Sequence, residues 1–360
     1  MDYNRKIVLE DGQEYCGYGF GAQKDRVCEL VFNTSMAGYQ EILSDPSYAG
    51  QAVVMTYPLI GNYGINDDDF ETEVPAIGAL IVREYNDEPS NFRSRHTLGE
   101  IMKEYGVCGI YGPDTRKLAR SIRNYGSRKA LITDTGTDSR TALKLLAETE
   151  LPSDSVLKVS CRQPYTVMAV PERFRVAVID CGMKKNIVRC LADRGCSVLV
   201  FPWNTSAEEI LESRPDGLFI SNGPGDPADV PETEETVRKL LGKLPVFGIC
   251  LGHQIIARAY GAETYKLKFG HRGGNHPVKN LDTGRIEITS QNHSFAVKKD
   301  SLADTPLTVT HVNLLDGTIE GLKCERNGMF CVQFHPESAP GPVDSGYLFD
   351  RFIKMMEENA

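Results

Sequence analysis

Residues 175–201 read RVAVIDCGMKKNIVRCLADRGCSVLVF, and this stretch decides the fold. RVAVID (175–180) is a short apolar run typical of a buried strand, and CSVLVF (196–201) is a second one. Between them, residues 184–195 have the apolar spacing of a helix that ends in Gly195. A strand, a helix and a strand in this order form a βαβ unit, whose two strands lie parallel in one sheet.

The same alternation continues toward the C-terminus. We expect helices around 206–213 and 232–243 and from about Leu251, strands at 216–221 and 245–249, further strands near 285–289, 306–311 and 329–334, and a closing helix at 345–358. Strands that alternate with helices predict a mostly parallel sheet with helices on both faces. The fold class predicted for this part of the chain is therefore α/β.

The earlier part of the chain has a different pattern. Strand-like stretches such as IVLE (7–10) and QAVVMTY (51–57) are separated by Gly/Pro turns, and helices are expected around 97–105 and 114–125. Residues 151–173 carry three prolines and no clear period. The prediction is a smaller α+β domain over 1–150, a linker over 151–173 and the α/β domain over 174–358.

Composition excludes several classes of protein. The net charge is -9 and no Lys/Arg run is present, which argues against nucleic acid as a partner. No apolar run approaches the roughly 20 residues of a membrane span, and the first ten residues, MDYNRKIVLE, do not resemble a signal peptide. The ten cysteines include no C-x-x-C pair, which argues against zinc knuckles and a disulfide framework. We expect a cytoplasmic protein without a membrane segment.

One cysteine stands in a reactive context. PVFGICLGHQ (245–254) runs from a buried strand into Gly248-Ile249-Cys250-Leu251-Gly252, the layout of the G-x-S-x-G nucleophile elbow with cysteine in place of serine. Small flanking residues let the chain turn sharply, and a position at the start of a helix favours the thiolate over the thiol. The alternative is a buried structural cysteine, so a base and an orienting group are also required.

His335 is the candidate base. It follows an apolar strand at 329–334 and precedes Pro336-Glu337. Residues i and i+2 of an extended segment point to the same side, so Glu337 can fix the imidazole tautomer. Other histidines, such as His253 and His271, have no adjacent acidic partner. No H-E-x-x-H motif or close His/Cys pair is present either, so no metal site is predicted.

Donors for an oxyanion complete the chemistry. The backbone N–H of Leu251, directly after the nucleophile, is one, and SNGPGDP (221–227) follows a neighbouring strand where a second can come from. The alternative for 221–227 is a phosphate loop, but no Lys-Ser/Thr follows and its prolines remove donors.

Three motifs together, SNGPGDP (221–227), PVFGICLGHQ (245–254) and QFHPE (333–337), resemble those of class I glutamine amidotransferases. This resemblance covers about 172–358. It implies a catalytic triad of Cys250, His335 and Glu337 that attacks the glutamine side-chain amide, forms a glutamyl thioester and releases ammonia.

Over nearly all of its 360 residues, the chain is similar to the small subunits of carbamoyl phosphate synthetases. The stretches that carry this resemblance are VFNTSMAGYQEILSDPSYAGQ (31–51), DTRKLAR (114–120), KFGHRGGNHPV (268–278), SQNHSFAV (290–297) and PESAPGP (336–342). The resemblance implies a glutamine site formed by Ser47, Gly223, Gly225, Leu251, Gln254, Asn292, Ser294 and Phe295. Glycine is common in the family where this chain has Ser294.

The resemblance also implies a division of labour. The chain has no Walker motif, so ATP and divalent metal are expected on a large synthetase subunit, and no cofactor is expected on this chain. The two subunits are expected to form a heterodimer that can assemble further. The implied product, carbamoyl phosphate, serves pyrimidine and arginine biosynthesis. Two alternatives stay open: a non-catalytic regulatory subunit, which the presence of Cys250 and His335 disfavours, and a stand-alone cysteine hydrolase, which the GPGDP and NHSF matches disfavour.

Overall fold

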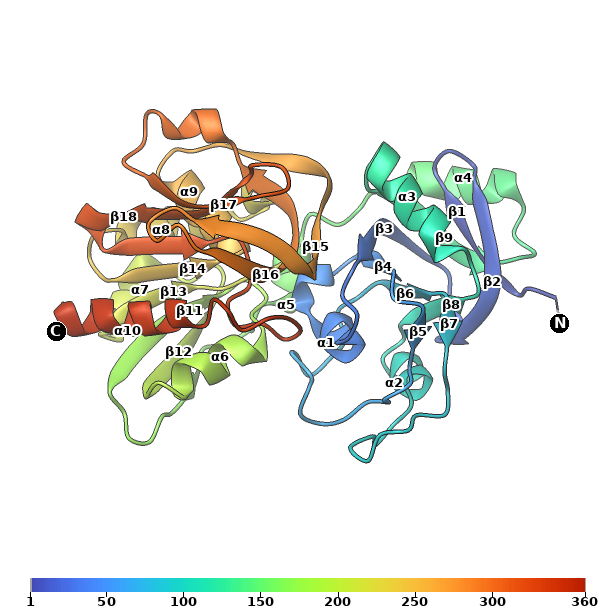
Figure 1. The fold of residues 1–360 in the computed structure, drawn as a ribbon, viewed down its shortest axis with the longest axis horizontal. Coiled ribbons are helices and arrows are strands. Elements are labelled where there is room, and N and C mark those ends of the chain that lie inside the picture. The colour runs from blue at the N-terminus through green and yellow to red at the C-terminus, as the bar shows by residue number, and fades with distance from the viewer. Residues whose placement is uncertain (1, 360) are drawn as a thin grey trace. The chain divides into compact units, whose positions relative to one another are not determined.

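The fold is described from a computed structural model, which describes residues 2–359. The chain divides into two compact units, one ending at Pro152 and one beginning at Ser153 (Figure 1). Among the described residues, none of the helices combines the length and the apolar character needed to cross a bilayer.

The first unit is built on a closed β-barrel with the strand order β1-β2-β8-β6-β4-β3-β9. Its strands are β1 (Arg5–Leu9), β2 (Glu14–Gly21), β3 (Arg26–Asn33), β4 (Gln51–Met55), β6 (Ala79–Val82), β8 (Cys108–Tyr111) and β9 (Arg128–Asp134). A small parallel pair, β5 (Leu59–Ile60) and β7 (Glu84–Tyr85), accompanies the barrel. The helices are α1 (Tyr39–Ser44), the 3-10 turn η1 (Pro46–Tyr48), α2 (Leu98–Glu104), α3 (Thr115–Tyr125) and α4 (Ser139–Glu148).

Two of these helices lie where the sequence predicts them, and their first turns explain why. Thr97 and Glu100 form a reciprocal capping box at the start of α2. The Asp114 side chain accepts a hydrogen bond from the backbone N–H of Lys117 at the start of α3. These local signals do not depend on tertiary structure, so the helix starts could be identified from the sequence.

The second unit is built on a ten-stranded sheet with the order β10-β12-β11-β13-β14-β19-β18-β17-β15-β16. Its strands are β10 (Tyr165–Val167), β11 (Phe174–Asp180), β12 (Cys196–Pro202), β13 (Gly217–Ile220), β14 (Val246–Ile249), β15 (Thr264–Asn280), β16 (Ile286–Val297), β17 (Thr308–Asn313), β18 (Ile319–Cys324) and β19 (Met329–Val332). The helices are α5 (Ser155–Val159), α6 (Lys185–Ala192), α7 (Ala207–Glu212), α8 (Pro231–Leu240), α9 (Leu251–Ala259) and α10 (Tyr347–Glu358), with short 3-10 turns η2 (Pro227–Asp229), η3 (Lys299–Leu302) and η4 (Glu325–Asn327).

The centre of this sheet is the predicted parallel α/β core. Strands β12, β11, β13, β14 and β19 are parallel neighbours, whereas β18, β17, β15 and β16 continue the sheet antiparallel. The sequence pattern does not predict strands β15 and β18. The apolar residues of β15 do not alternate regularly, and its pairing with β16 shifts register twice, so no clear period-2 signal exists.

The segment predicted as a linker, 151–173, contains regular structure and belongs largely to the second unit. It contains the helix α5, and its strand β10 pairs antiparallel with β12 at the edge of the sheet. Two of the three residues of β10, Tyr165 and Thr166, are exposed, so the strand has almost no buried face that the sequence could reveal.

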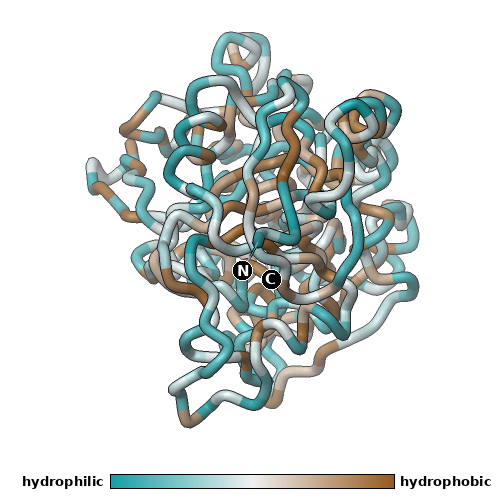
Figure 2. The backbone as a smooth tube through the Cα atoms, turned by 90° about the vertical axis from the view of Figure 1, so that its right-hand side faces the viewer, coloured by the Kyte–Doolittle hydropathy of each residue, from teal (hydrophilic) through white to brown (hydrophobic). Residues whose placement is uncertain are grey.

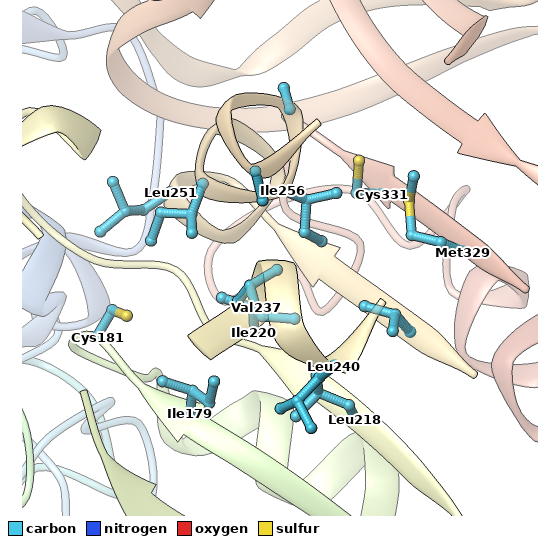
Figure 3. Packing of buried hydrophobic residues seen from close by; sticks show 14 of the residues in the cluster. Ile179, Cys181, Leu218, Ile220, Val237, Leu240, Leu251, Ile256, Met329 and Cys331 are labelled. Atoms are coloured by element: carbon cyan, nitrogen blue, oxygen red, sulfur yellow. The ribbon is translucent and has the colours of Figure 1, made fainter. Parts of the chain in front are cut away.

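The core of the second unit lies on both faces of the sheet. Along β11, Ala177 and Ile179 pack on one side with residues of α8 and α9, while Val176 and Val178 pack on the other with residues of α6 and α10. Figure 3 shows the first cluster from close by, and Figure 2 shows that apolar stretches of the chain gather mainly in the interior. Burying one aliphatic side chain completely stabilises the fold by roughly 1.5–3 kcal/mol. This packing holds the strand ends in fixed positions.

Candidate active site

The turn between β14 and α9 holds Cys250 in a strained conformation. Its φ is 55° and its ψ is -106°, a region that non-glycine residues rarely occupy. The flanking glycines are needed for space, because a Cβ on Gly248 would meet Ile256 Cδ1 at 2.4 Å and one on Gly252 would meet the Ile220 carbonyl oxygen at 2.3 Å. The helix therefore packs directly against the strands, and the cysteine occupies a tight elbow.

The thiol of Cys250 lies inside the second unit, where the residue is 2% exposed. Its Sγ donates to the carbonyl oxygen of Asn292 on β16 over 3.6 Å. Because the residue forms the N-terminal boundary of α9, the first N–H groups of that helix point toward this region with their partial positive charge. The surroundings combine an acceptor for the thiol with donors suited to a developing negative charge.

A buried chain of charged groups leads to the imidazole of His335. Its Nδ1 lies 2.6 Å from Glu337 Oε1, and the same carboxylate oxygen accepts from Lys184 Nζ over 2.8 Å. Lys184 Nζ also donates to the carbonyl oxygen of Ser338 over 2.8 Å. The sequence pattern does not single out Lys184, because a lone lysine before a helix carries no local signal of its distant partner.

These charges shift two pKa values in opposite directions. Burial by itself lowers the pKa of His335 most strongly, but the Glu337 carboxylate and Cys250 together outweigh it, and the pKa rises to about 10. Burial by itself raises the pKa of Glu337, but Lys184 and His335 outweigh it, and that pKa falls to about 2. At neutral pH the group is an imidazolium held by a carboxylate, and the carboxylate is held by an ammonium.

The second imidazole nitrogen is available to the thiol. His335 Nε2 is buried and makes no hydrogen bond of ordinary geometry to a described residue. Cys250 lies near enough to contribute to the raised pKa of His335. The thiol is therefore the neighbour with which this nitrogen can exchange a proton.

The loop after β13 reaches the same edge of the sheet. Gly223 admits no side chain, because a Cβ there would lie 2.1 Å from the Cys181 carbonyl oxygen, and Gly225 has a φ of +89°, which favours glycine. Asn222 Oδ1 accepts the backbone N–H of Lys184 over 3.1 Å. This hydrogen bond ties the loop to the segment that carries the lysine, at the carboxyl ends of the parallel strands where α/β folds bind ligands.

Two predicted binding residues on β16, Asn292 and Phe295, contact Cys250 and α9. Gln254, on α9, donates from Nε2 to the Phe295 carbonyl oxygen over 2.8 Å and to Gln333 Oε1 over 3.0 Å. Asn292 accepts from Cys250, as described above. The structure thus brings Cys250, Gln254, Asn292 and Phe295 together through contacts between α9 and β16.

The remaining predicted binding residues differ in their surroundings. Leu251 packs its side chain in the core at 1% exposure, so only its backbone is available for binding. Ser294 Oγ accepts a hydrogen bond from the guanidinium of Arg272. Ser47 belongs to the first unit, where it is 7% exposed in η1 and its N–H donates to Asp45 Oδ1 over 2.9 Å. Its part in a glutamine site stays a prediction.

Two family models match this chain. The model described as "Glutamine amidotransferase class-I" matches residues 177–355, and the model described as "Carbamoyl-phosphate synthase small chain, CPSase domain" matches residues 7–132. Together they account for both structural units.

Curated relatives match over nearly their whole length. A "Carbamoyl phosphate synthase small chain" from Fusobacterium nucleatum is 52% identical over 357 residues, covering 99% of this chain and 99% of the relative. A "Carbamoyl phosphate synthase pyrimidine-specific small chain" from Halalkalibacterium halodurans is 54% identical, covering 99% and 98%. A "Carbamoyl phosphate synthase small chain" from Staphylococcus epidermidis is 52% identical, covering 98% and 96%.

Proposed function

Because this chain belongs to the family of carbamoyl phosphate synthase small chains, we propose that it hydrolyses glutamine with Cys250 as the nucleophile. The Cys250 thiolate attacks the side-chain amide carbon of glutamine, and the tetrahedral intermediate collapses as the His335 imidazolium gives its proton to the leaving ammonia. A glutamyl thioester remains. Water, deprotonated by the now neutral imidazole, attacks the thioester carbon and releases glutamate and the thiolate.

The observation that carries this proposal is the continuous buried chain from Lys184 through Glu337 and His335 toward Cys250. A purely structural cysteine needs no strained backbone and no imidazole with its own buried carboxylate. The carboxylate fixes the imidazole tautomer, so Nε2 is the nitrogen that faces the thiol.

Backbone donors would stabilise the oxyanion of the intermediate. One donor would be the N–H of Leu251, which lies directly after the nucleophile at the first turn of α9. A second would come from the loop that contains Gly223 and Gly225, after the neighbouring strand β13. Within the second unit, glutamine itself would be held by the side chain of Gln254 and by residues Asn292, Ser294 and Phe295 on β16.

The partner and location follow from the same proposal. The released ammonia would pass to a large synthetase subunit, which holds ATP and divalent metal and combines ammonia with bicarbonate to make carbamoyl phosphate. The two chains would form a heterodimer that can assemble further. All ten cysteines are free, which supports a reducing compartment, and we place the enzyme in the cytoplasm.

A glutamine-analogue diazoketone tests the nucleophile, because such reagents alkylate the thiolate that attacks glutamine. The expected result is one label per chain, on the peptide containing Cys250, with protection by excess glutamine. A label on another of the ten cysteines, or one that glutamine does not prevent, would contradict the proposal. His335→Asn serves as the matched variant, since it should slow labelling without removing the thiol.

A further inference from the structure

Three buried side chains that the glutamine chemistry does not use meet in the second unit. They are His271 on β15, His293 on β16 and Glu320 on β18, and their ligand atoms all lie within 4.8 Å of one another. His271 and His293 are direct cross-strand partners in the β15–β16 pairing. Figure 1 shows the strands of this antiparallel part of the sheet. Strand pairing thus creates a cluster that is dispersed along the sequence.

The cluster has unsatisfied polar atoms. His271, His293 and Glu320 are 6%, 5% and 0% exposed, so water does not solvate them freely. His271 Nδ1 and Glu320 Oε2 are buried and have no hydrogen-bond partner among the described residues. Buried carboxylate oxygens without partners are costly and rare. A cation between these atoms would satisfy both.

The opposite nitrogen of each imidazole is already held by an oxygen acceptor. His271 Nε2 lies 2.9 Å from Asp316 Oδ2, and His293 Nδ1 lies 2.7 Å from the Phe295 carbonyl oxygen. If each of these nitrogens carries the proton, His271 Nδ1 and His293 Nε2 are left with lone pairs. An imidazole that donates one N–H to a carboxylate or carbonyl and offers its other nitrogen is the usual arrangement around protein-bound zinc.

The third ligand is oriented in a similar way. Asn313 Nδ2 donates to Glu320 Oε1 over 3.1 Å, which fixes the carboxylate and leaves Oε2 open. His293 Nε2 faces Gln291 Oε1 at 3.1 Å, and a rotation of that amide turns a donor toward the imidazole instead. A metal ion at Nε2 would take the place of this neutral amide hydrogen bond.

We propose that His271, His293 and Glu320 bind one divalent transition-metal ion of the Zn²⁺ class, with water as the fourth ligand. Two imidazoles and one carboxylate suit zinc, whereas calcium and magnesium prefer oxygen ligands alone. The ion would join β15, β16 and β18. It would also fix the part of β16 where His293 stands between Asn292 and Ser294.

The competing occupant is a proton. A protonated His271 would form an ion pair with Asp316 at 2.9 Å and with Glu320 at 3.6 Å, and no metal would enter. The experiment must separate these two occupants. It must also exclude zinc bound by the thiol of Cys250, so it uses the full-length chain in a Cys250→Ser background.

The chain is purified without chelators, incubated with Zn²⁺ alone, dialysed against metal-free buffer and analysed for bound metal by mass spectrometry. About one zinc per chain is expected, with a loss of at least about 10-fold in affinity for Glu320→Gln and for His271→Asn. Glu287→Gln is the matched control. Glu287 lies on β16, and its carboxylate is buried like that of Glu320. It accepts a hydrogen bond from Tyr347 and lies outside the cluster, so its replacement should leave zinc binding unchanged.

Cobalt supplies a second readout that does not depend on activity. Co²⁺ in this site should give the visible d–d bands of a four-coordinate ion without a thiolate charge-transfer band, and Glu320→Gln should abolish them. His293→Asn replaces Glu320→Gln if the latter does not fold. Absence of bound zinc in the Cys250→Ser chain would overturn the proposal, as would zinc binding that the cluster variants leave unchanged.

Discussion

Lys184 Nζ and Glu337 Oε1 form an ion pair of 2.8 Å in which the side chains are 3% and 0% exposed. The partners are 153 positions apart in the chain. The carboxylate oxygen that accepts from the lysine is also the one that contacts His335. Glu337 is thus held between two cations, so the charge of each group depends on the other two.

Replacing Lys184 with methionine should lower both stability and glutaminase activity. The variant leaves the buried Glu337 with one cationic partner, and breaking a buried ion pair in this way costs on the order of 3 kcal/mol. Urea unfolding measures the cost. Lys185→Met is the control, since Lys185 is exposed on α6 and its replacement should change stability by less than about 0.5 kcal/mol. Equal effects of the two substitutions would contradict the account.

The raised pKa of His335 predicts a pH-dependent contribution to stability. The pKa is about 10 in the folded protein and about 6.5 in an unfolded chain. The protonated group therefore stabilises the fold fully below pH 6.5, and this stabilisation is lost as the pH rises through 10. The difference in unfolding free energy between the wild type and His335→Gln should shrink across this window. A difference independent of pH would contradict the assigned protonation state.

Gly252→Ala should distort the elbow. The added Cβ would lie 2.3 Å from the Ile220 carbonyl oxygen, so α9 must move away from the sheet. Overpacking of this kind costs about 1–3 kcal/mol, and the displacement of Cys250 should reduce kcat. Gly136→Ala is the matched control, because a Cβ at Gly136 meets nothing within 4 Å. Denaturant midpoints and glutaminase assays on both variants test this prediction.

The two polar positions beside the elbow should affect KM differently. Gln254→Ala removes the amide that donates to Phe295 and Gln333, so KM for glutamine should rise by about 10-fold or more. Ser294→Gly removes only a hydroxyl that accepts from Arg272, and a backbone contact to glutamine would survive. Its KM should change by less than about 3-fold. Steady-state kinetics distinguishes the two, and a larger effect at Ser294 would assign its hydroxyl to the substrate.

Sequence reasoning could predict features encoded by neighbouring residues. Alternating strands and helices gave the parallel core, and the two-residue spacing of His335 and Glu337 indicated the hydrogen bond that the structure contains. Gly248 and Gly252 indicated a tight turn. The structure explains both glycines, because neither position has room for a Cβ.

Features created by strand pairing could not be predicted in this way. Lys184 meets Glu337 only because β11 and β19 end at the same edge of the sheet, on either side of β13 and β14. His271 and His293 meet only through the register of β15 and β16, and the apolar residues of β15 do not alternate regularly. No short motif records either contact, so the lysine and the histidine cluster became visible only in three dimensions.

The most direct test of the central claim replaces Cys250 with alanine in the complex with the large subunit. Carbamoyl phosphate synthesis is then measured with glutamine and, separately, with free ammonia. The account predicts that glutamine-dependent synthesis is lost while ammonia-dependent synthesis is retained, because only the release of ammonia requires the thiol. Glutamine-dependent synthesis at an unchanged rate would show that Cys250 is not the nucleophile.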